Sequence, residues 1–319
     1  MGSNKSIYKP PYSLTSNMVN LVSDISDAVT RLEYSEKAFA SPRLRKKNRV
    51  KTLSGTLEIE GNHLGEEKIT AILEGKRVLG TVTEVAEVKG AIRAYAELES
   101  YNPESMDDLL QAHRLLMNDL LTQAGKFRTI QVGVGQHVAP PADRVHGLMS
   151  DLFQWLQASE EHPLINSCLF HYEFEFIHPF VDGNGRMGRL WQTVILYQWR
   201  NLFSLIPTES IVRDQQEAYY QALERSGVQG SCNPFIEFML NAILLAVQSS
   251  VKSSVKGAVK TDERILDYFK QNPTGTVKPL AEELGLSLRA VEKHIAALKA
   301  EGALIRTGSP RKGTWEVTR

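Results

Sequence analysis

The 319-residue sequence lacks several features that would assign it to a specialised class of protein. It has only two cysteines, Cys168 and Cys232, which lie far apart without metal-ligand spacing; this argues against a disulfide framework or zinc site and favours a reducing compartment. It has 37 Lys and Arg against 37 Asp and Glu, so the whole molecule has no net charge to attract nucleic acid or membranes. Any such binding must come from a local patch.

Long apolar segments are also missing. The N-terminus has no apolar core of a signal peptide, and the longest apolar stretch, Phe235 to Val247, is interrupted by Glu237 and Asn241 and is short for a bilayer. We therefore expect a cytoplasmic protein with no membrane partner. The length suggests about two domains of ordinary globular composition.

Helical periodicity dominates the first three-quarters of the chain, and convincing strand alternation is scarce. Apolar spacing predicts a helix starting near Thr15, followed by helices over residues 43–60, 66–74, 82–100, 105–121, 143–158, 163–176, 187–200, 212–226 and 233–250. Between Arg128 and Pro141 the pattern changes to a short β-hairpin or flap. We divide the chain into an N-terminal helical region (1–104), a core domain (105–250), a polar linker (251–260) and a C-terminal domain (261–319).

The C-terminal domain has the pattern of a small winged helix-turn-helix. Helices are predicted over residues 262–271, 278–284 and 287–301, followed by a hairpin over 303–317. Val291, Ile295 and Leu298 form the core face of the third helix. Eleven Lys and Arg against eight Asp and Glu from residue 259 onward make the domain only mildly basic.

Six basic side chains of this domain are placed to contact DNA phosphates or bases. They are Arg289, Lys293, His294, Arg306, Arg311 and Lys312. Glu292 on the same helix weakens the case for DNA, and winged helices also serve as protein-docking modules. The sequence leaves both partners open.

The stretch from His178 to Arg189 combines residues suited to binding the phosphates of a nucleotide. Pro179 ends the preceding helix and a helical apolar pattern resumes at Leu190, so this loop opens onto a helix N-terminus, where unpaired amides and the helix dipole favour an anion. Further donors are the amides of Gly183, Asn184 and Gly185 and the guanidiniums of Arg186 and Arg189.

The same stretch resembles the motif of the Fic family (filamentation induced by cyclic AMP), His-x-Phe-x-Asp/Glu-Gly-Asn-Gly-Arg-x-x-Arg. The eight fixed positions are matched by His178, Phe180, Asp182, Gly183, Asn184, Gly185, Arg186 and Arg189. The helix, loop, helix context also agrees. The resemblance implies a mainly α fold: a Fic-type helical bundle with a short β-hairpin flap, plus the winged helix-turn-helix domain.

The resemblance also implies an activity, the transfer of AMP from ATP to a hydroxyl of a protein. His178 would be the base, Asp182 would hold Mg²⁺, and Phe180 would anchor the loop in the core. Gly183, Asn184, Gly185, Arg186 and Arg189 would bind the phosphates. Tyr219 and Tyr220 lie where the family often has aromatic residues near the base of the nucleotide.

Two further segments resemble parts of the family. The flap resembles the segment that docks a target protein by strand addition, which gives Arg128, Thr129, Ile130, Gln131 and Val132 as docking residues. Thr56, Glu60 and Gly61 fit the pattern Ser/Thr-x-x-x-Glu-Gly/Asn of an inhibitory helix, here N-terminal to the motif. In that arrangement Glu60 would pair with Arg189 and hold ATP in an unreactive geometry.

Several alternatives remain open from the sequence. Glu60 could instead activate water and remove AMP from a modified protein. The nucleotide site could sense rather than catalyse, in a DNA-binding regulator. The donor could be another nucleotide, the target could be the protein itself, and a homodimer is plausible.

Overall fold

The computed structural model describes residues 8–34, 42–134, 137–308 and 313–318. The protein is mainly α-helical, as predicted, and the described strands form two antiparallel hairpins. The chain divides into two compact units, residues 1–30 with 47–247, and residues 31–46 with 248–319. Our division at 105 and 251 therefore stays a prediction, because these units follow other boundaries.

The helices follow the predicted order closely. They are α1 (Ser16–Tyr34), α2 (Pro42–Ile59), α3 (Gly65–Leu73), α4 (Val82–Ala96), η1 (Leu98–Ser100), α5 (Met106–Met117), η2 (Ala142–Arg144), α6 (Val145–Ala158), α7 (Pro163–Ile177), α8 (Asn184–Trp199), η3 (Asn201–Leu205), α9 (Thr208–Asp214), α10 (Gln216–Gln229) and α11 (Asn233–Gln271). Two predicted helices are interrupted: 82–100 ends in a separate 3-10 turn, and 212–226 corresponds to α9 and α10.

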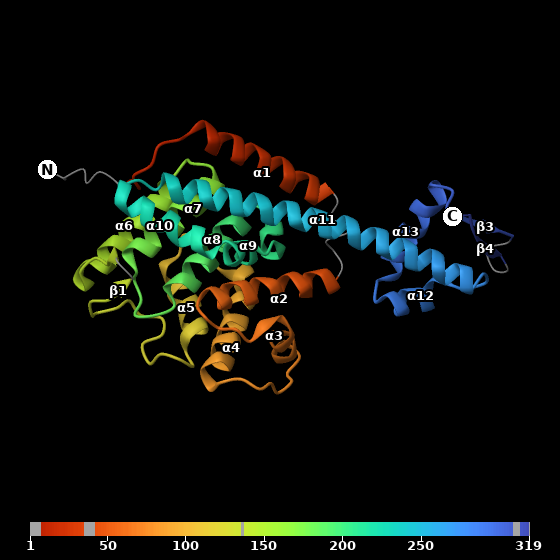
Figure 1. The fold of residues 1–319 in the computed structure, drawn as a ribbon, viewed down its shortest axis with the longest axis horizontal. Helices are drawn as coiled ribbons and strands as arrows, with labels where there is room; N and C mark the ends of the chain where they lie inside the picture. Colours follow the sequence, from red (N-terminus) through yellow and green to blue (C-terminus); the bar gives the residue numbers. More distant parts are fainter. Residues whose placement is uncertain (1–7, 35–41, 135–136, 309–312, 319) are drawn as a thin grey trace. The chain divides into compact units, whose positions relative to one another are not determined.

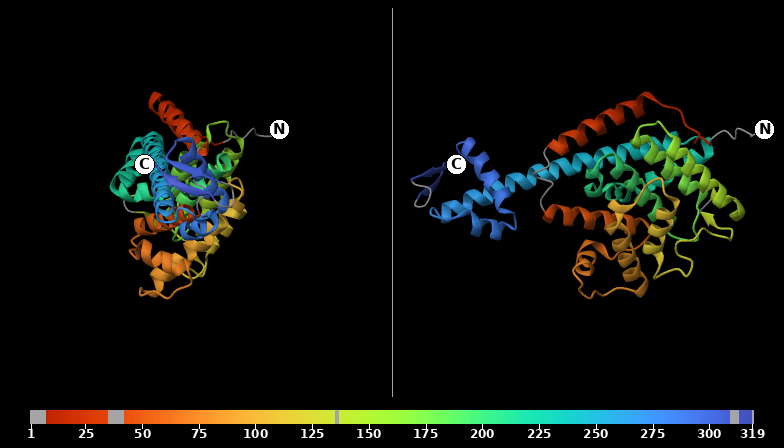
Figure 2. Two further views of the ribbon diagram at one scale, coloured as in Figure 1. Left: turned by 90° about the vertical axis from the view of Figure 1, so that its right-hand side faces the viewer. Right: turned by 180° about the vertical axis from the view of Figure 1, so that it is seen from behind.

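Helices α7 and α8 form the centre of the first unit. Their side chains are buried on almost all sides, in line with sequences that carry apolar residues around the whole helix. Figure 1 shows α11 along one side of this pair and α2 and α4 along the other, and Figure 2 shows the same order from behind. The loop between α7 and α8 is the predicted phosphate loop, so two buried helices hold its ends.

Helix α11 bears on two expectations. The polar segment 251–260, predicted as a linker, is helical and lies inside this continuous helix, and its role as a link stays a prediction. The apolar part of the helix covers Asn233–Val251 and is, by length and composition, long enough to cross a membrane, whereas we judged Phe235 to Val247 too short. Half of this window is buried in the protein. Packing in the core therefore accounts for its apolar character.

The second unit contains the predicted winged helix-turn-helix. Its elements are the end of α11, α12 (Val277–Leu284), α13 (Leu288–Ala300), β3 (Leu304–Thr307) and β4 (Thr314–Val317). Gly285 has a left-handed φ of 65° at the turn, and the Ser287 side chain caps α13. Val291, Ile295 and Leu298 are buried in the core of this winged module, as predicted.

The predicted flap is shorter than expected. Gly133–Val134 (β1) pairs with His137–Val138 (β2), so residues 128–132 precede the first strand rather than forming it. Gln131 donates from Nε2 to the Ala139 carbonyl, 2.7 Å away. The side chain of Ile130 is 57% exposed. Residues 128–132, which include the exposed Ile130, therefore form no strand.

Candidate nucleotide site

The signature loop, residues 178–189, begins with an unusual backbone. His178 has a left-handed φ of 51°, unlike every other non-glycine residue that the structure describes. Its amide donates to the Phe174 carbonyl, 2.9 Å away, and thereby ends α7. A left-handed conformation costs a residue with a β-carbon on the order of 1–2 kcal/mol. The surrounding contacts must therefore hold it in place.

Asn184 fixes the shape of the loop from inside. Its side chain accepts from the Phe180 amide and donates to the Phe180 carbonyl, both at 2.9 Å. The Phe180 ring is fully buried and stacks on His113 at 3.6 Å between centroids. Phe180 is thus a core anchor, as expected, and the Asn184 side chain is occupied with the backbone. The contribution of Asn184 to an anion site is its amide.

His113 supports the loop from α5, and we did not anticipate it from the sequence. Its Nδ1 accepts from the Gly125 amide at 2.8 Å, so the ring proton lies on Nε2, which donates to the Asp182 carbonyl at 3.0 Å. Burial lowers the pKa of His113 to about 4. The ring is therefore neutral at physiological pH and acts as a fixed hydrogen-bonding strut.

The loop ends on the N-terminus of α8. Gly183 is the cap residue with φ 83°, a conformation that favours glycine, and a Cβ there would also lie 2.9 Å from the sulfur of Met117. The first-turn amides of α8 have no acceptor within the helix, which makes this end an anion site. The Gly183 amide itself donates to Asp182 Oδ1 at 2.6 Å. The amides of Asn184 and Gly185 are then the main backbone donors.

Asp182 is the residue placed to share a cation with a bound phosphate. Its side chain is 56% exposed at the α8 N-terminus. Among the described residues no group of three or more His, Cys, Asp or Glu side chains is arranged around a metal position. This donor set fits an Mg²⁺ ion that takes most of its ligands from substrate oxygens and water.

Both arginines of the loop are buried and paired with carboxylates from the N-terminal helices. Arg186 Nη1 lies 3.2 Å from Glu87 Oε1 on α4, and Glu87 Oε2 also accepts from the Asn62 side chain at 2.8 Å. Arg186 Nη2 lies 3.3 Å from Asp182 Oδ1. Glu87 is a second residue that we did not predict, because nothing in its local sequence distinguishes it from other helical glutamates.

Arg189 makes the ion pair that we predicted. Its Nη2 lies 2.7 Å from Glu60 Oε1, and its guanidinium also donates to the Thr56 hydroxyl and carbonyl, each at 3.1 Å. The Arg189 side chain is 2% exposed and that of Glu60 is 27% exposed. Burial by itself lowers the pKa of Arg189, but the Glu60 carboxylate raises it above its ordinary value. The Nε and Nη2 atoms of Arg189 are thus engaged by Thr56 and Glu60, whereas its buried Nη1 has no hydrogen-bond partner among the described residues.

The end of α2 directs Glu60 into the site. Gly61 has φ 87°, the Asn62 amide donates to the Leu57 carbonyl and the Gly61 amide donates to the Glu58 carbonyl, which together form a Schellman motif. Glu60 is therefore the cap residue and not part of the helix proper. Gly185 has no side chain, and a Cβ at this position would collide with Glu60 Oε1. The Glu60 carboxylate consequently occupies the same position, at the N-terminus of α8, that a bound phosphate would occupy.

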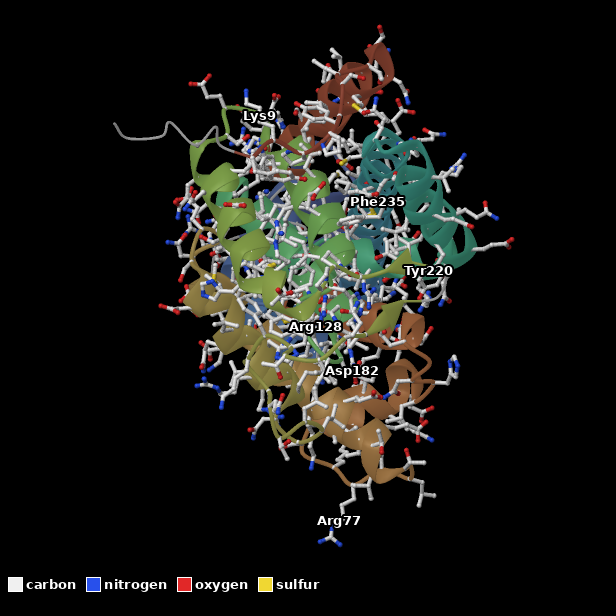
Figure 3. All side chains as sticks on the ribbon, turned by 90° about the vertical axis from the view of Figure 1, so that its left-hand side faces the viewer. Lys9, Arg77, Arg128, Asp182, Tyr220 and Phe235 are labelled. Carbon is white, nitrogen blue, oxygen red and sulfur yellow. The ribbon has the colours of Figure 1, made fainter. Side chains whose placement is uncertain are left out.

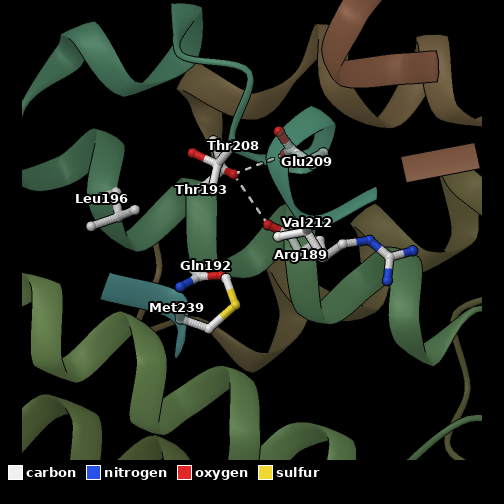
Figure 4. A pocket seen from close by; sticks show the side chains of 8 residues that line it. All are labelled: Arg189, Gln192, Thr193, Leu196, Thr208, Glu209, Val212 and Met239. Carbon is white, nitrogen blue, oxygen red and sulfur yellow. Dashed lines mark hydrogen bonds between the residues drawn. The ribbon is translucent and has the colours of Figure 1, made fainter. Parts of the chain in front are cut away.

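The interior behind Arg189 is too small for a nucleotide. A cavity of about 10 Å³, enough for about one water molecule, is lined by Arg189, Gln192, Thr193, Leu196, Thr208, Glu209, Val212 and Met239 (Figure 4). Burial raises the pKa of Glu209 to about 7. Thr193 and Tyr95 each donate a hydroxyl to Glu209 Oε1 at 3.2 Å. This cavity therefore cannot hold a nucleotide.

Arg128 is not available for docking a target protein. It is buried, and its guanidinium donates to the carbonyls of His178 (2.7 Å), Ile130 (3.1 Å), Pro140 (2.6 Å) and Ile177 (3.3 Å). Figure 3 shows it among packed side chains, whereas Arg77, between α3 and α4, projects from the protein. Thr129, Ile130 and Gln131 are exposed and Val132 is half-buried. The docking role of these four residues stays a prediction.

The aromatic pair on α10 is split between core and surface. Tyr219 is buried, with its hydroxyl 3.2 Å from His171 Nε2, while Tyr220 is 47% exposed. Burial raises the pKa of Tyr219 well above its ordinary value, and Glu175 and Glu60 raise it further. Only Tyr220 is open to a nucleotide base.

The charged residues of the winged module are mostly at the surface. Arg289 and Lys293 are exposed on α13. His294 Nδ1 lies 2.6 Å from Asp262 Oδ1, and the Arg306 guanidinium stacks on Trp315 at 4.8 Å, so both have partners inside the module. Arg311 and Lys312 lie outside the described residues. Of the four predicted residues that the structure describes, Arg289 and Lys293 are the exposed ones.

Comparison with known proteins agrees with both parts of this description. The profile of the Fic/DOC family matches residues 103–196, and the profile described as winged helix-turn-helix DNA-binding matches residues 260–305. Two curated relatives are the protein adenylyltransferase Fic of Drosophila ananassae and the protein adenylyltransferase fic-1 of Caenorhabditis elegans, each 29% identical over 67% and 70% of this chain. The chain spans only 43% and 44% of their lengths.

Solved structures extend the likeness to the whole chain. A Fic family protein from Desulfovibrio desulfuricans G20 is 39% identical, covers 98% of both chains and superposes with a TM-score of 0.75. Residues 134–508 of Fic-1 from C. elegans are 25% identical, with a TM-score of 0.63 over 75% of this chain and 72% of that one. With the geometry of the signature loop, these similarities show that the chain belongs to the Fic family.

Proposed function

We propose that the protein transfers AMP from ATP to a hydroxyl side chain of another protein and releases pyrophosphate. One observation carries the proposal: a single loop holds an imidazole, a helix N-terminus and two buried arginines within twelve residues, His178 to Arg189. The names of the curated relatives support it, since both are called protein adenylyltransferases.

The proposed reaction uses these groups in a fixed order. The neutral imidazole of His178 accepts the proton of the target hydroxyl, and the hydroxyl oxygen attacks the α-phosphorus. The bond from that phosphorus to the bridging oxygen breaks, and pyrophosphate leaves with the electron pair. The amides of Asn184 and Gly185 and the guanidiniums of Arg186 and Arg189 bind the phosphate oxygens. Asp182 would hold an Mg²⁺ ion, which would supply positive charge beside those oxygens.

We also propose that Glu60 inhibits this reaction. The carboxylate occupies Arg189 and the space above Gly185, where the outer phosphates of ATP would bind. ATP then has to bind without Arg189, in a geometry unsuited to in-line attack. A Glu60→Gly variant frees the arginine.

The experiment compares the wild-type protein with Glu60→Gly after incubation with ATP and Mg²⁺, using intact-mass analysis. We expect a gain of one adenylate on the variant itself or on an added target, at least about tenfold faster than in the wild type, because one buried arginine–phosphate contact is worth a few kcal/mol. No mass gain with ATP or with any other nucleoside triphosphate would contradict the proposal.

The opposite direction, removal of AMP, is tested in the same assay. Protein that Glu60→Gly has modified is mixed with the wild-type protein. Faster loss of the adenylate with wild-type protein than with Glu60→Gly would make Glu60 a hydrolytic base, placed to activate water beside the α8 N-terminus.

A second proposed function is DNA binding by the winged module. It is supported by the exposure of Arg289 and Lys293, one turn apart near the N-terminal end of α13, the part of such a helix that enters the major groove. The matched family description, winged helix-turn-helix DNA-binding, agrees with this.

A further inference from the structure

Glu175 lies next to the proposed base without a role in the reaction described so far. It is on α7, three residues before His178, and its Oε2 lies 3.9 Å from His178 Nδ1. Its other oxygen, Oε1, lies 3.8 Å from His171 Nε2. The side chain is 11% exposed. A carboxyl group is thus buried between two imidazoles at the end of one helix.

Close packing fixes the depth of this carboxyl group. It lies against the backbone of α8 at Gly188, where an added Cβ would be 2.7 Å from Glu175 Oε1 and 2.8 Å from the ring of His171. Gly188 is one of the two variable positions between the motif arginines. The absence of a side chain there makes room for Glu175.

His171 cannot be the hydrogen-bond donor that Glu175 requires. Its Nδ1 lies 2.9 Å from Gln192 Oε1, an acceptor, so the ring proton lies on Nδ1. Its Nε2 then accepts from the Tyr219 hydroxyl at 3.2 Å. Burial lowers the pKa of His171 to about 3, so it carries no second proton. Glu175 therefore faces a lone pair at His171, and the neighbouring imidazole with a proton to offer is His178.

Titratable groups from several packed elements face Glu175, and two of them, Arg189 on α8 and Glu60 after α2, carry charge. The others are His171 and His178 on α7 and Tyr219 and Tyr220 on α10. Burial raises the pKa of Glu175 to about 8, Arg189 lowers it and Glu60 raises it. Removal of the Glu60 carboxylate therefore favours the ionised form of Glu175.

We propose that Glu175 is a positioning residue for His178: its carboxylate accepts the Nδ1 proton of the imidazole, turns Nε2 towards the target hydroxyl and stabilises the imidazolium formed by proton transfer. The inference rests on the proposed function, in which His178 is the base. The 3.9 Å separation exceeds a hydrogen bond, so the proposal requires the two side chains to approach each other when the target hydroxyl binds. Glu60 then has two effects, since it occupies Arg189 and also opposes ionisation of Glu175.

The test uses the full chain with Glu60→Gly and adds Glu175→Gln, which keeps the shape and an acceptor oxygen but removes the charge. We expect AMP transfer to fall by about 10- to 100-fold with little change in the KM for ATP, because only proton transfer is affected. The NMR titration of the His178 imidazole should move to lower pH by about one unit, because an imidazolium and an ionised Glu175 stabilise each other and glutamine has no ionised form.

The matched control is Glu173→Gln. Glu173 is a buried carboxyl on the same helix, but it accepts from the hydroxyl of Tyr8 and the thiol of Cys232, away from the loop. It should leave the His178 titration unchanged. If Glu175→Gln does not fold, Glu175→Asp replaces it, because one methylene fewer withdraws the charge from Nδ1 and should lower transfer in the same direction.

The outcomes separate this inference from the proposed function. An unchanged rate and an unchanged His178 titration in Glu60→Gly/Glu175→Gln overturn the positioning role and leave the transferase proposal intact. If Glu60→Gly itself transfers no AMP, the transferase proposal fails, and the NMR titration alone still decides whether Glu175 acts on His178. A shift to lower pH supports it and an unshifted titration overturns it.

Discussion

The signature loop and the winged module both carry basic residues, but they hold them in opposite ways. Arg186 and Arg189 are 3% and 2% exposed and each contacts a carboxylate. Arg289 and Lys293 are exposed on one face of α13. A buried charge needs a specific partner, so each arginine of the loop is held in one position by its carboxylate. Exposed charges attract a charged partner such as DNA through their summed electrostatic potential, and each contributes little to the binding free energy by itself.

This comparison predicts large effects of single substitutions in the loop and small ones in the winged module. The largest effect is expected for His178→Ala. In the Glu60→Gly background, AMP transfer from labelled ATP should fall by about 100- to 10,000-fold, the usual contribution of a general base. His63→Ala, which removes an exposed histidine, is the matched control and should retain the rate. Undiminished labelling with His178→Ala would refute the role of the imidazole.

The next largest effect is expected for Asn184→Ala, on the stability of the fold. The substitution leaves the buried amide and carbonyl of Phe180 without their 2.9 Å partners, which costs about 2–4 kcal/mol of the free energy of unfolding. Urea unfolding of the variant measures it. Asn20→Ala, at an exposed position on α1, should change stability by less than about 0.5 kcal/mol. Equal stabilities of the two variants would mean that the loop is not held by Asn184.

The pH dependence of stability should be smaller but measurable. The pKa of His113 is about 4 in the folded protein, below the ordinary value of 6.5, so the unfolded chain binds more protons between these pH values. The stabilisation is complete above pH 6.5 and is lost as the pH falls, by about 1 kcal/mol between pH 7 and pH 5.5 from this residue. Unfolding of His113→Gln, which keeps a donor and an acceptor, should depend less on pH over this range. An identical pH dependence would argue against a neutral His113 in the fold.

The smallest effects are expected in the winged module. Arg289→Ala and Lys293→Ala should each weaken DNA binding by about three- to tenfold. Each should also reduce by about one the slope of the logarithm of the binding constant against the logarithm of the salt concentration. AMP transfer should be unchanged. Lys299→Ala, in the last turn of the same helix, is the control and should leave DNA binding unchanged. A single substitution that abolished binding would contradict the contrast between the two regions.

The sequence predicted the parts of the molecule that depend on local patterns. Helical periodicity placed most helices to within a few residues, although it divided α11 into two helices. The motif identified the loop, the ion pair of Glu60 with Arg189 and the buried ring of Phe180. It failed where a role depends on contacts distant in sequence. His113 and Glu87 resemble ordinary helical residues until the fold brings them to the loop.

Two other features differ from what composition and resemblance suggested. The polar segment 251–260, predicted to link the domains, is helical and lies within α11. Arg128 was named from the resemblance of the flap to a docking segment, and its guanidinium is buried and bonds main-chain carbonyls. A charged residue with enough internal acceptors can be buried, and one sequence does not reveal those acceptors.

The contacts of Arg128 have a consequence for how the protein responds to strain. One planar fork joins the carbonyls of Ile130 and Pro140, at the two ends of the flap segment, to those of Ile177 and His178, where α7 stops. Lysine lacks this geometry, since its ammonium group cannot span four oxygens in one plane. A force that pulls on the flap is therefore transmitted mechanically to the backbone of the imidazole, and the two segments shift together or not at all.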